Sequence, residues 1–315
     1  MSPEALLQKY DRLIRLALAE CWQTLQSGTN MAEVTRLLAQ GDIPGALATL
    51  ARVEPQIYAS VAPILEDAIL ESGRYVAEVL PAGAVVSPVV VSLTDPRTAS
   101  YVSQYVGTRI VEISNETVEA VRNRVLWSVN AGRPPSATAR DIRDVIGLNT
   151  TQELAVRNFR LALEEDPRSA MSRELRDKRF DPTLERGEPL TREQIDRMVA
   201  RYQANQLKFR TESIARTESM TAISVGQSQG IAQGIQSGAI RTVRPDGSQL
   251  RKFWIATQDG RTRHDHVVVP GMNKGGVEIT GMFRTPLGPM AFPRDPAGSA
   301  ANVIRCRCRV AYRWV

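Results

Sequence analysis

Both histidines of the chain and two of its three cysteines stand in closely spaced pairs. The pairs are His264-Asp-His266 and Cys306-Arg-Cys308. Residues two apart face the same side of a strand, so each pair could present two ligands to one point. Imidazole nitrogen and thiolate sulfur are ligands that zinc prefers. The spacing therefore predicts a metal site, although one intervening residue is rarer in zinc proteins than the two of Cys-x-x-Cys.

Two interpretations of this cluster remain open. In the first, His266, Cys306 and Cys308 are three ligands of zinc, and Asp259 or His264 is the fourth. In the second, the cysteines are core thiols and His266 is hydrogen-bonded to Asp259 or to a backbone group. A disulfide between the two cysteines is disfavoured by strand geometry and by a reducing cytoplasm.

A group of charged residues predicts a buried ion network. Arg216 and Glu218 stand on an expected long helix, and Asp259, Arg261 and Arg263 follow an expected strand. Helix positions two apart differ by about 200°, so the first two residues point to nearly opposite sides. We therefore expect Glu218 to pair with Arg261 or Arg263. We expect Arg216 to meet Asp259 or a backbone carbonyl.

A catalytic interpretation of these residues is the rival. Glu218 and Asp259 could act as an acid/base pair with His266 as the general base. No nucleophile motif, phosphate-binding loop or nucleotide fingerprint accompanies them. We therefore expect a protein that is not an enzyme. The alternative is a metal-dependent hydrolase or nuclease that uses the His/Cys/Asp cluster.

Positive charge is concentrated in the last third of the chain. Residues 201–315 hold 17 Lys and Arg against 7 Asp and Glu, whereas the whole chain has a net charge of +6. Such a balance favours non-specific contact with double-stranded DNA through phosphates. Solvated arginines with internal ion pairs are the other interpretation. The candidate DNA contacts are Arg241, Arg244, Arg251, Lys252, Arg305, Arg307 and Arg309.

The pattern of apolar residues predicts an α+β protein. Residues 1–80 predict a helical N-terminal domain, 81–98 an extended connector and 99–238 a helical middle region that ends in a long helix. Residues 239–315 are rich in Gly and Pro and predict a small C-terminal α/β module of short strands. The most apolar segment is too short to span a bilayer, so we expect no membrane contact.

Local signals add detail to the long helix. Thr191 and Gln194 predict a capping box at its start. Gly226, Gly230 and Gly234 are four residues apart, which predicts one small-residue ridge that another backbone can approach closely. The alternative is a frayed helix end, because glycine costs about 1 kcal/mol relative to alanine.

Two further segments have a distinct composition. Residues 240–244 and 250–255 predict a hairpin around the Pro245-Asp-Gly247 turn. Residues 173–188 are highly charged and predict an exposed, mobile loop.

The ordered C-terminal residues resemble the signature of the phage Mu F-like head-morphogenesis (minor capsid protein) family. The resemblance covers about two-thirds of the chain and leaves the first 80 residues outside it. Arg305 departs from the pattern, since an Asn before the first cysteine is common there, and His264 falls at a variable position. The matching residues are Arg216, Thr217, Glu218, Trp254, Asp259, Arg261, Arg263, His266, Gly271, Cys306 and Cys308.

This resemblance implies a structural protein of a tailed bacteriophage. Such a protein is expected in the virion, in the capsid interior, after synthesis in the host cytoplasm. Its implied partners are the portal protein and the major capsid or scaffolding protein. Its implied work is procapsid assembly, with a part in DNA packaging or delivery.

Overall fold

Helices make up most of the chain, and the described residues contain a single three-stranded antiparallel sheet. The computed structural model describes residues 2–49 and 53–315, and 63% of the chain is helical. The predicted α+β class, mostly helical with a small C-terminal sheet, is therefore confirmed.

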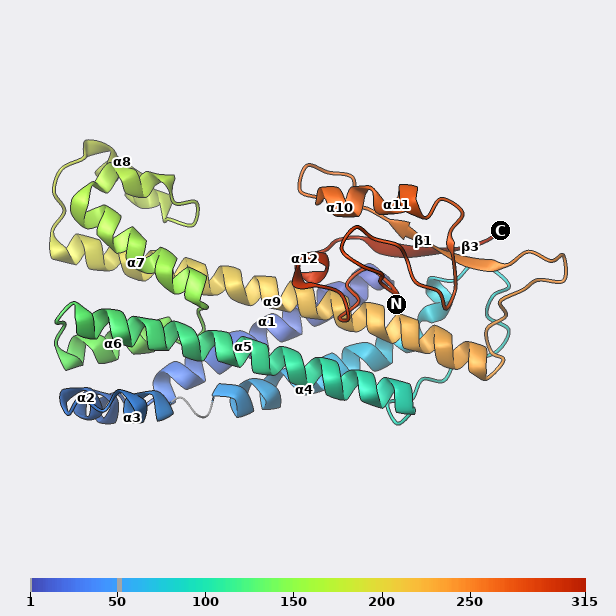
Figure 1. Cartoon of the computed structure of the whole chain (residues 1–315), viewed down its shortest axis with the longest axis horizontal. Helices are drawn as coiled ribbons and strands as arrows, with labels where there is room; N and C mark the ends of the chain where they lie inside the picture. The colour runs from blue at the N-terminus through green and yellow to red at the C-terminus, as the bar shows by residue number, and fades with distance from the viewer. Residues whose placement is uncertain (1, 50–52) are drawn as a thin grey trace. The chain divides into compact units, whose positions relative to one another are not determined.

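The elements follow one another along the chain as Figure 1 labels them. Twelve α-helices, three strands and three short 3-10 helices (η) lie within the described residues: α1 Pro3–Gly28, α2 Met31–Ala39, α3 Ile43–Ala48, α4 Val53–Arg74, η1 Val76–Glu78, α5 Pro96–Asn130, α6 Pro135–Val145, α7 Thr150–Glu165, η2 Pro167–Ser172, η3 Lys178–Phe180, α8 Asp181–Arg186, α9 Arg192–Gln236, β1 Leu250–Ile255, α10 His264–Val267, α11 Val269–Met272, β2 Val277–Glu278, α12 Ala300–Val303 and β3 Arg309–Trp314. No helix among these residues is both long enough and apolar enough to cross a bilayer.

Two compact units divide the chain. Unit 1 contains residues 1–16, 61–107 and 213–315, and unit 2 contains residues 17–60 and 108–212. The boundaries near residues 80, 98 and 238 that composition indicates follow changes of secondary structure. The compact units are instead each assembled from segments that lie far apart in the sequence, because the long helices bring those segments together.

In unit 1, the glycines of α9 allow a close backbone contact with α4. A Cβ on Gly230 would lie 2.5 Å from the backbone oxygen of Gly73, and one on Gly226 would overlap the backbone oxygen of Ile69. Gly234 has a different neighbour, since its Cβ would meet the side chain of Ile240. The predicted close approach at the glycine ridge is therefore confirmed, and the frayed-helix alternative is wrong.

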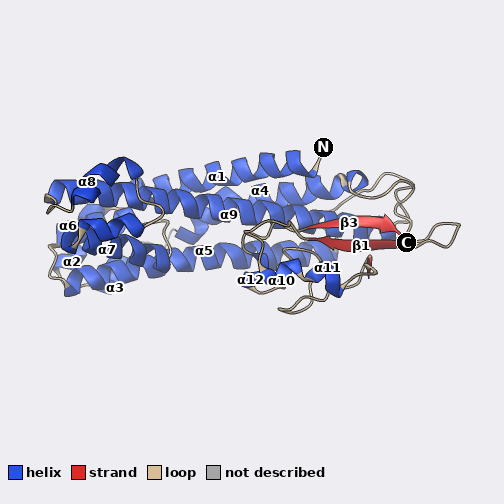
Figure 2. Ribbon diagram, turned by 90° about the horizontal axis from the view of Figure 1, so that it is seen from above, coloured by secondary structure: helices blue, strands red, loops and turns tan. Residues whose placement is uncertain are grey.

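The sheet of unit 1 has the order β2-β1-β3. Figure 2 shows β1 and β3 side by side, and their register pairs Leu250 with Trp314 and Ile255 with Arg309. Residues 240–244 form only isolated bridges, such as Val243 to Gln249. The prediction of a first hairpin strand at these residues is therefore wrong. Ile240 is instead buried in an apolar cluster with side chains from η1 and α9.

Unit 2 is a helical unit whose elements begin with recognisable caps. Asn149 and Gln152 form a capping box at the start of α7. The predicted cap of α9 is also confirmed, because Thr191 N donates to Gln194 Oε1 at 2.8 Å and Gln194 N donates to Thr191 Oγ1 at 3.3 Å. These reciprocal bonds satisfy backbone donors that the first turn of a helix leaves without partners.

The charged segment 173–188 of unit 2 is ordered, whereas its composition predicts an exposed, mobile loop. It contains η3 and α8, and its Leu184 is buried. Arg176 and Asp181 are joined by two hydrogen bonds of 2.8 Å. Gly187 then ends α8 in the left-handed region at φ 68°. The high charge reflects local ion pairs of an ordered segment rather than an exposed loop without structure.

Candidate metal centre

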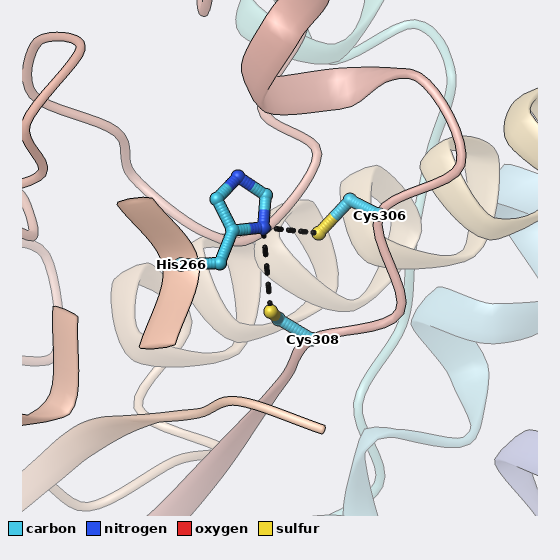
Figure 3. Close-up of side chains that lie close together, drawn as sticks. All are labelled: His266, Cys306 and Cys308. Carbon is cyan, nitrogen blue, oxygen red and sulfur yellow. Dashed lines mark hydrogen bonds between the residues drawn. The ribbon is translucent and has the colours of Figure 1, made fainter. Parts of the chain in front are cut away.

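Three potential metal ligands of unit 1 lie together in a buried site. His266 comes from α10, whereas Cys306 and Cys308 come from the segment before β3. His266 Nδ1 lies 3.4 Å from Cys306 Sγ and 3.5 Å from Cys308 Sγ, and Figure 3 shows the imidazole facing both sulfurs. The three ligand atoms lie within 4.8 Å of one another, so the cluster could hold a metal ion.

Apolar packing positions these side chains. The two cysteines belong to a buried cluster with Trp254 of β1 and Phe283. The Trp254 ring meets the His266 ring edge to face, with 5.8 Å between the ring centroids. This packing restricts the rotamers of the ligands, and such preorganisation is what a metal site requires.

Asn302 orients the imidazole. His266 Nε2 lies 3.3 Å from Asn302 Oδ1, and Asn302 is fully buried on α12. An amide oxygen only accepts hydrogen bonds, so Nε2 carries the proton and Nδ1 keeps its lone pair. Nδ1 is also the nitrogen that faces the sulfurs. This is the usual outer-shell arrangement of a metal-binding histidine.

The surroundings favour one thiolate. A hydrogen bond from Cys308 and the Arg294 guanidinium lower the pKa of Cys306. The same hydrogen bond and burial raise the pKa of the Cys308 thiol above its usual range. Metal ions bind deprotonated sulfur, so metal binding would release the protons that the two thiols hold.

The other two predicted ligands lie outside this cluster. The Asp259 carboxylate accepts from both terminal nitrogens of Arg307, one of them at 2.6 Å, and this arginine holds the pKa of Asp259 well below its usual range. His264 is exposed at the first position of α10. Residues two apart diverge by about 200° on a helix, so His264 faces away from the side that His266 occupies. The predicted strand pair is thus corrected to a helix.

The expected ion network is also corrected. Glu218 is buried and accepts a hydrogen bond from the Tyr105 hydroxyl. Among the described residues, no ion pair joins Glu218 to Arg261 or Arg263. Arg263 instead donates to the Ile304 carbonyl.

A different arginine connects α9 with the metal-ligand segment. Arg294 is buried and donates to Ser224 Oγ at 2.8 Å and to the Met220 carbonyl at 3.3 Å, both on α9. It also donates to the carbonyls of Cys306 and Cys308. This one guanidinium therefore fixes the position of both cysteine backbones relative to α9.

The expected partners of Arg216 also differ. Among the described residues, no hydrogen bond or ion pair joins the Arg216 side chain to Asp259 or to a backbone carbonyl. The carboxylate of Asp259 is taken by Arg307, Thr262 and the Arg261 amide. The motif residue that does meet the terminal segment is Thr217, which accepts from the Arg305 amide at 3.2 Å.

The basic residues expected to contact DNA separate into two groups. The prediction that Lys252 contacts DNA is wrong, because this residue is buried on the inner face of β1. Its amine donates to the Ala291 carbonyl at 2.7 Å. Burial lowers the pKa of this amine to about 8. The others are exposed or half-buried side chains: Arg241, Arg244, Arg251, Arg305, Arg307 and Arg309.

Several residues of the site were not expected from sequence. Arg313 pairs with Arg251 across the strands and is exposed, so it extends the basic outer face of the sheet. Strand alternation could have identified Arg313. Nothing in the sequence reveals the contacts of Arg294 or Asn302, since each acts through a contact with a residue distant in the chain.

Comparisons of the chain with known protein families, with curated proteins and with solved structures return no match.

Proposed function

We propose that this chain is a structural minor head protein of a tailed bacteriophage, in which zinc stabilises the C-terminal module. The observation that supports this most is the convergence of separated motif residues. Trp254, His266, Cys306 and Cys308 belong to the residues that resemble the head-morphogenesis signature, and they meet in one buried cluster. Side chains that are buried together stabilise the fold of the C-terminal module, which is consistent with a structural protein.

Zinc suits the donor set and its spacing. Zinc bonds of about 2.3 Å to sulfur and 2.0–2.1 Å to nitrogen in a tetrahedron separate the two ligand atoms by about 3.6 Å. The nitrogen of His266 lies 3.4 Å and 3.5 Å from the two sulfurs. Protein purified without a histidine tag should therefore contain about one zinc per chain. If the protein contained no metal and its thermal stability did not change in a chelator, the three residues would be core side chains and not metal ligands.

The phage role is tested by capture of its expected partners. Tagged chain should retain the portal protein, and the major capsid or scaffolding protein, from the lysate of an infected host. The double variant Cys306→Ala/Cys308→Ala should lose this capture if the zinc-stabilised module makes the contact. Cys21→Ala removes a buried thiol of unit 2 and is the matched control. Retention by the double variant, or no capture by the native chain, contradicts the proposal.

Non-specific DNA contact is assigned to the outer face of the sheet. Arg251 on β1 and Arg309 and Arg313 on β3 lie on this face. Binding to duplex DNA should be independent of sequence and should fall steeply with salt, because bound phosphates release counterions. Changing the three arginines to Gln should reduce the salt slope by about three.

The control for this experiment changes three exposed arginines of unit 2 to Gln, namely Arg122, Arg140 and Arg192. It removes the same charge, so the slope of the control variant should stay near that of the native chain. An equal loss in both variants would mean that net charge alone accounts for binding.

A metal-dependent hydrolase or nuclease is the second candidate. It is favoured by one observation, namely that the cluster supplies three ligands, as catalytic zinc sites do. Hydrolysis of DNA or of a test ester with added divalent metal, abolished by His266→Ala, would support this activity. Metal-loaded protein without such turnover would favour the structural role.

A further inference from the structure

We propose that the arginines around the metal centre select an anionic oxygen ligand, a carboxylate or a phosphate, at the side that His266, Cys306 and Cys308 leave open. This inference rests on the proposed metal centre and adds the ligand class that it would take. The ligand comes from outside the chain. Its two sources, an acidic protein group and a phosphate, share a negative charge and an oxygen donor atom.

The site lacks a fourth ligand among the described residues. Tetrahedral zinc takes four donors, and the cluster supplies three. Asp259 is bound by Arg307 through both carboxylate oxygens, and His264 faces away on α10. The fourth position is therefore left to a group from outside.

The opening beside the three ligand residues is narrow. A cavity of about 10 Å³ is bordered by all three ligand residues. That volume holds the centre of about one water-sized atom. A single donor atom can reach the metal through this opening, while the rest of its molecule stays outside, so the ligand is a terminal group such as a carboxylate or phosphate oxygen.

Guanidinium groups surround the opening. The remaining lining residues are Arg261, Thr262, Arg263, Arg305 and Arg307. Arg307 pairs with Asp259, Arg263 donates to the Ile304 carbonyl, and Arg261 is exposed. A guanidinium binds carboxylate and phosphate oxygens through two parallel hydrogen bonds, whereas it has no acceptor to offer a cation. The lining therefore favours an anion over water or a neutral ligand.

Without such a ligand, the buried centre would carry a net positive charge. Two thiolates cancel the two charges of a zinc ion, which leaves the buried Arg294 guanidinium beside the cysteine carbonyls. No carboxylate forms an ion pair with Arg294 in the described part of the chain. One anionic ligand would make the centre neutral, and an uncompensated buried charge is costly.

Cobalt reports on this position directly. The full chain is loaded with Co²⁺ in place of zinc, and its visible absorption, which responds to the ligands of the metal, is recorded during titration. The probes are acetate, inorganic phosphate and methanol, the last as a neutral oxygen donor. We expect a saturable spectral change with acetate or phosphate and none with methanol. Acetate alone indicates an acidic protein group as the natural source, and phosphate alone indicates a nucleotide or nucleic-acid source.

Two variants test the role of the arginines. Arg261→Gln, which changes an exposed lining residue, should raise the Kd of the anion roughly 10-fold, because a hydrogen bond to a charged group is lost. Arg284→Gln is the matched control, because Arg284 is exposed in the same unit and does not line the cavity. Its Kd should stay within about twofold of the native value.

The outcomes separate this inference from the proposed metal centre. A chain that binds no cobalt loses both. A chain that binds cobalt but whose spectrum ignores both anions, or responds equally to methanol, keeps the metal centre and overturns the anion site. Equal weakening by Arg261→Gln and Arg284→Gln also overturns it, because general charge would then explain the binding.

Discussion

The two units treat buried arginines differently. In unit 2, Arg124 donates to Glu153 at 2.9 Å, and both side chains are buried, at 6% and 1% exposed. Arg210 is likewise buried and meets Glu116 at 2.9 Å, besides Thr117 Oγ1 and two carbonyls. Each buried cation of this helical unit therefore has a carboxylate from its own fold.

The C-terminal module of unit 1 solves the same problem without a carboxylate. Arg294 donates to Ser224 and to the carbonyls of Cys306 and Cys308. Both buried arginines of unit 2 therefore have a carboxylate partner within that unit. In the module, no carboxylate forms an ion pair with Arg294 among the described residues, and two thiolates that bind zinc would be balanced by the metal itself. Four experiments test this difference between the two units.

The largest effect is expected in unit 2. Glu153→Ala should lower the free energy of unfolding by about 3–5 kcal/mol, because it leaves Arg124 buried without its counter-charge. Denaturation in urea measures the change. Adding Arg124→Leu should recover part of the loss. The control Glu119→Ala removes one side of an exposed pair and should have little effect. If Glu153→Ala and Glu119→Ala lowered the free energy of unfolding equally, burial of the Arg124–Glu153 pair would not explain the loss.

Metal removal should act on the module and leave unit 2 unchanged. Metal at a thousand times its Kd stabilises the folded state by about 4 kcal/mol, which a chelator would remove. Hydrogen exchange measured by mass spectrometry should then show lost protection in peptides from residues 250–315 and none in those from α7. Uniform loss in both units would break the comparison.

The second buried cation of the module predicts a pH effect. Lys252 has a pKa of about 8 when folded, because burial disfavours its charge, whereas the unfolded side chain titrates near 10.5. Between these values the unfolded chain binds more protons, so the free energy of unfolding should rise with pH by about 3 kcal/mol.

Urea denaturation of the native chain and of Lys252→Met across pH 8 to 10.5 checks this. The variant should lose the rise, whereas Lys274→Met, at an exposed lysine, should keep it. A rise of equal size in all three proteins would assign it to other groups.

The smallest effect is expected at the exposed pair of the module. Asp259 and Arg307 are both about one-third exposed, at 35% and 30%. Exposed ion pairs contribute little, since water screens them. Asp259→Asn should therefore leave the urea midpoint within experimental error, and potassium chloride should not change that result. A large decrease in the urea midpoint would mean that the Asp259–Arg307 pair, rather than Arg294, holds the cysteine segment in place.

Much of the candidate site could be predicted from residue types alone. His266, Cys306 and Cys308 were identified because rare ligand residues gather in two short segments, and they meet as expected. The paired role of His264 could not be predicted correctly. Its outcome depends on whether residues 264–267 form a strand or a helix, and one turn of helix is too short to show a period.

The sequence by itself determined the features that depend on near neighbours. The helical composition, the cap made by Thr191 and Gln194, and the glycine ridge of α9 can all be read from residues at most four positions apart. Such contacts are set by the helix geometry, so their spacing is visible in the chain.

Only the tertiary structure decided which distant side chains meet. Arg294 reaches α9 across about 70 residues, and His266 reaches Asn302 and the cysteines across about 40. Glu218 meets Tyr105 rather than an arginine of the terminal turn. Any of several arginines would satisfy the same charge rule, and the choice among them is made by packing. A buried group bonds to whichever partner the surrounding apolar side chains bring within reach.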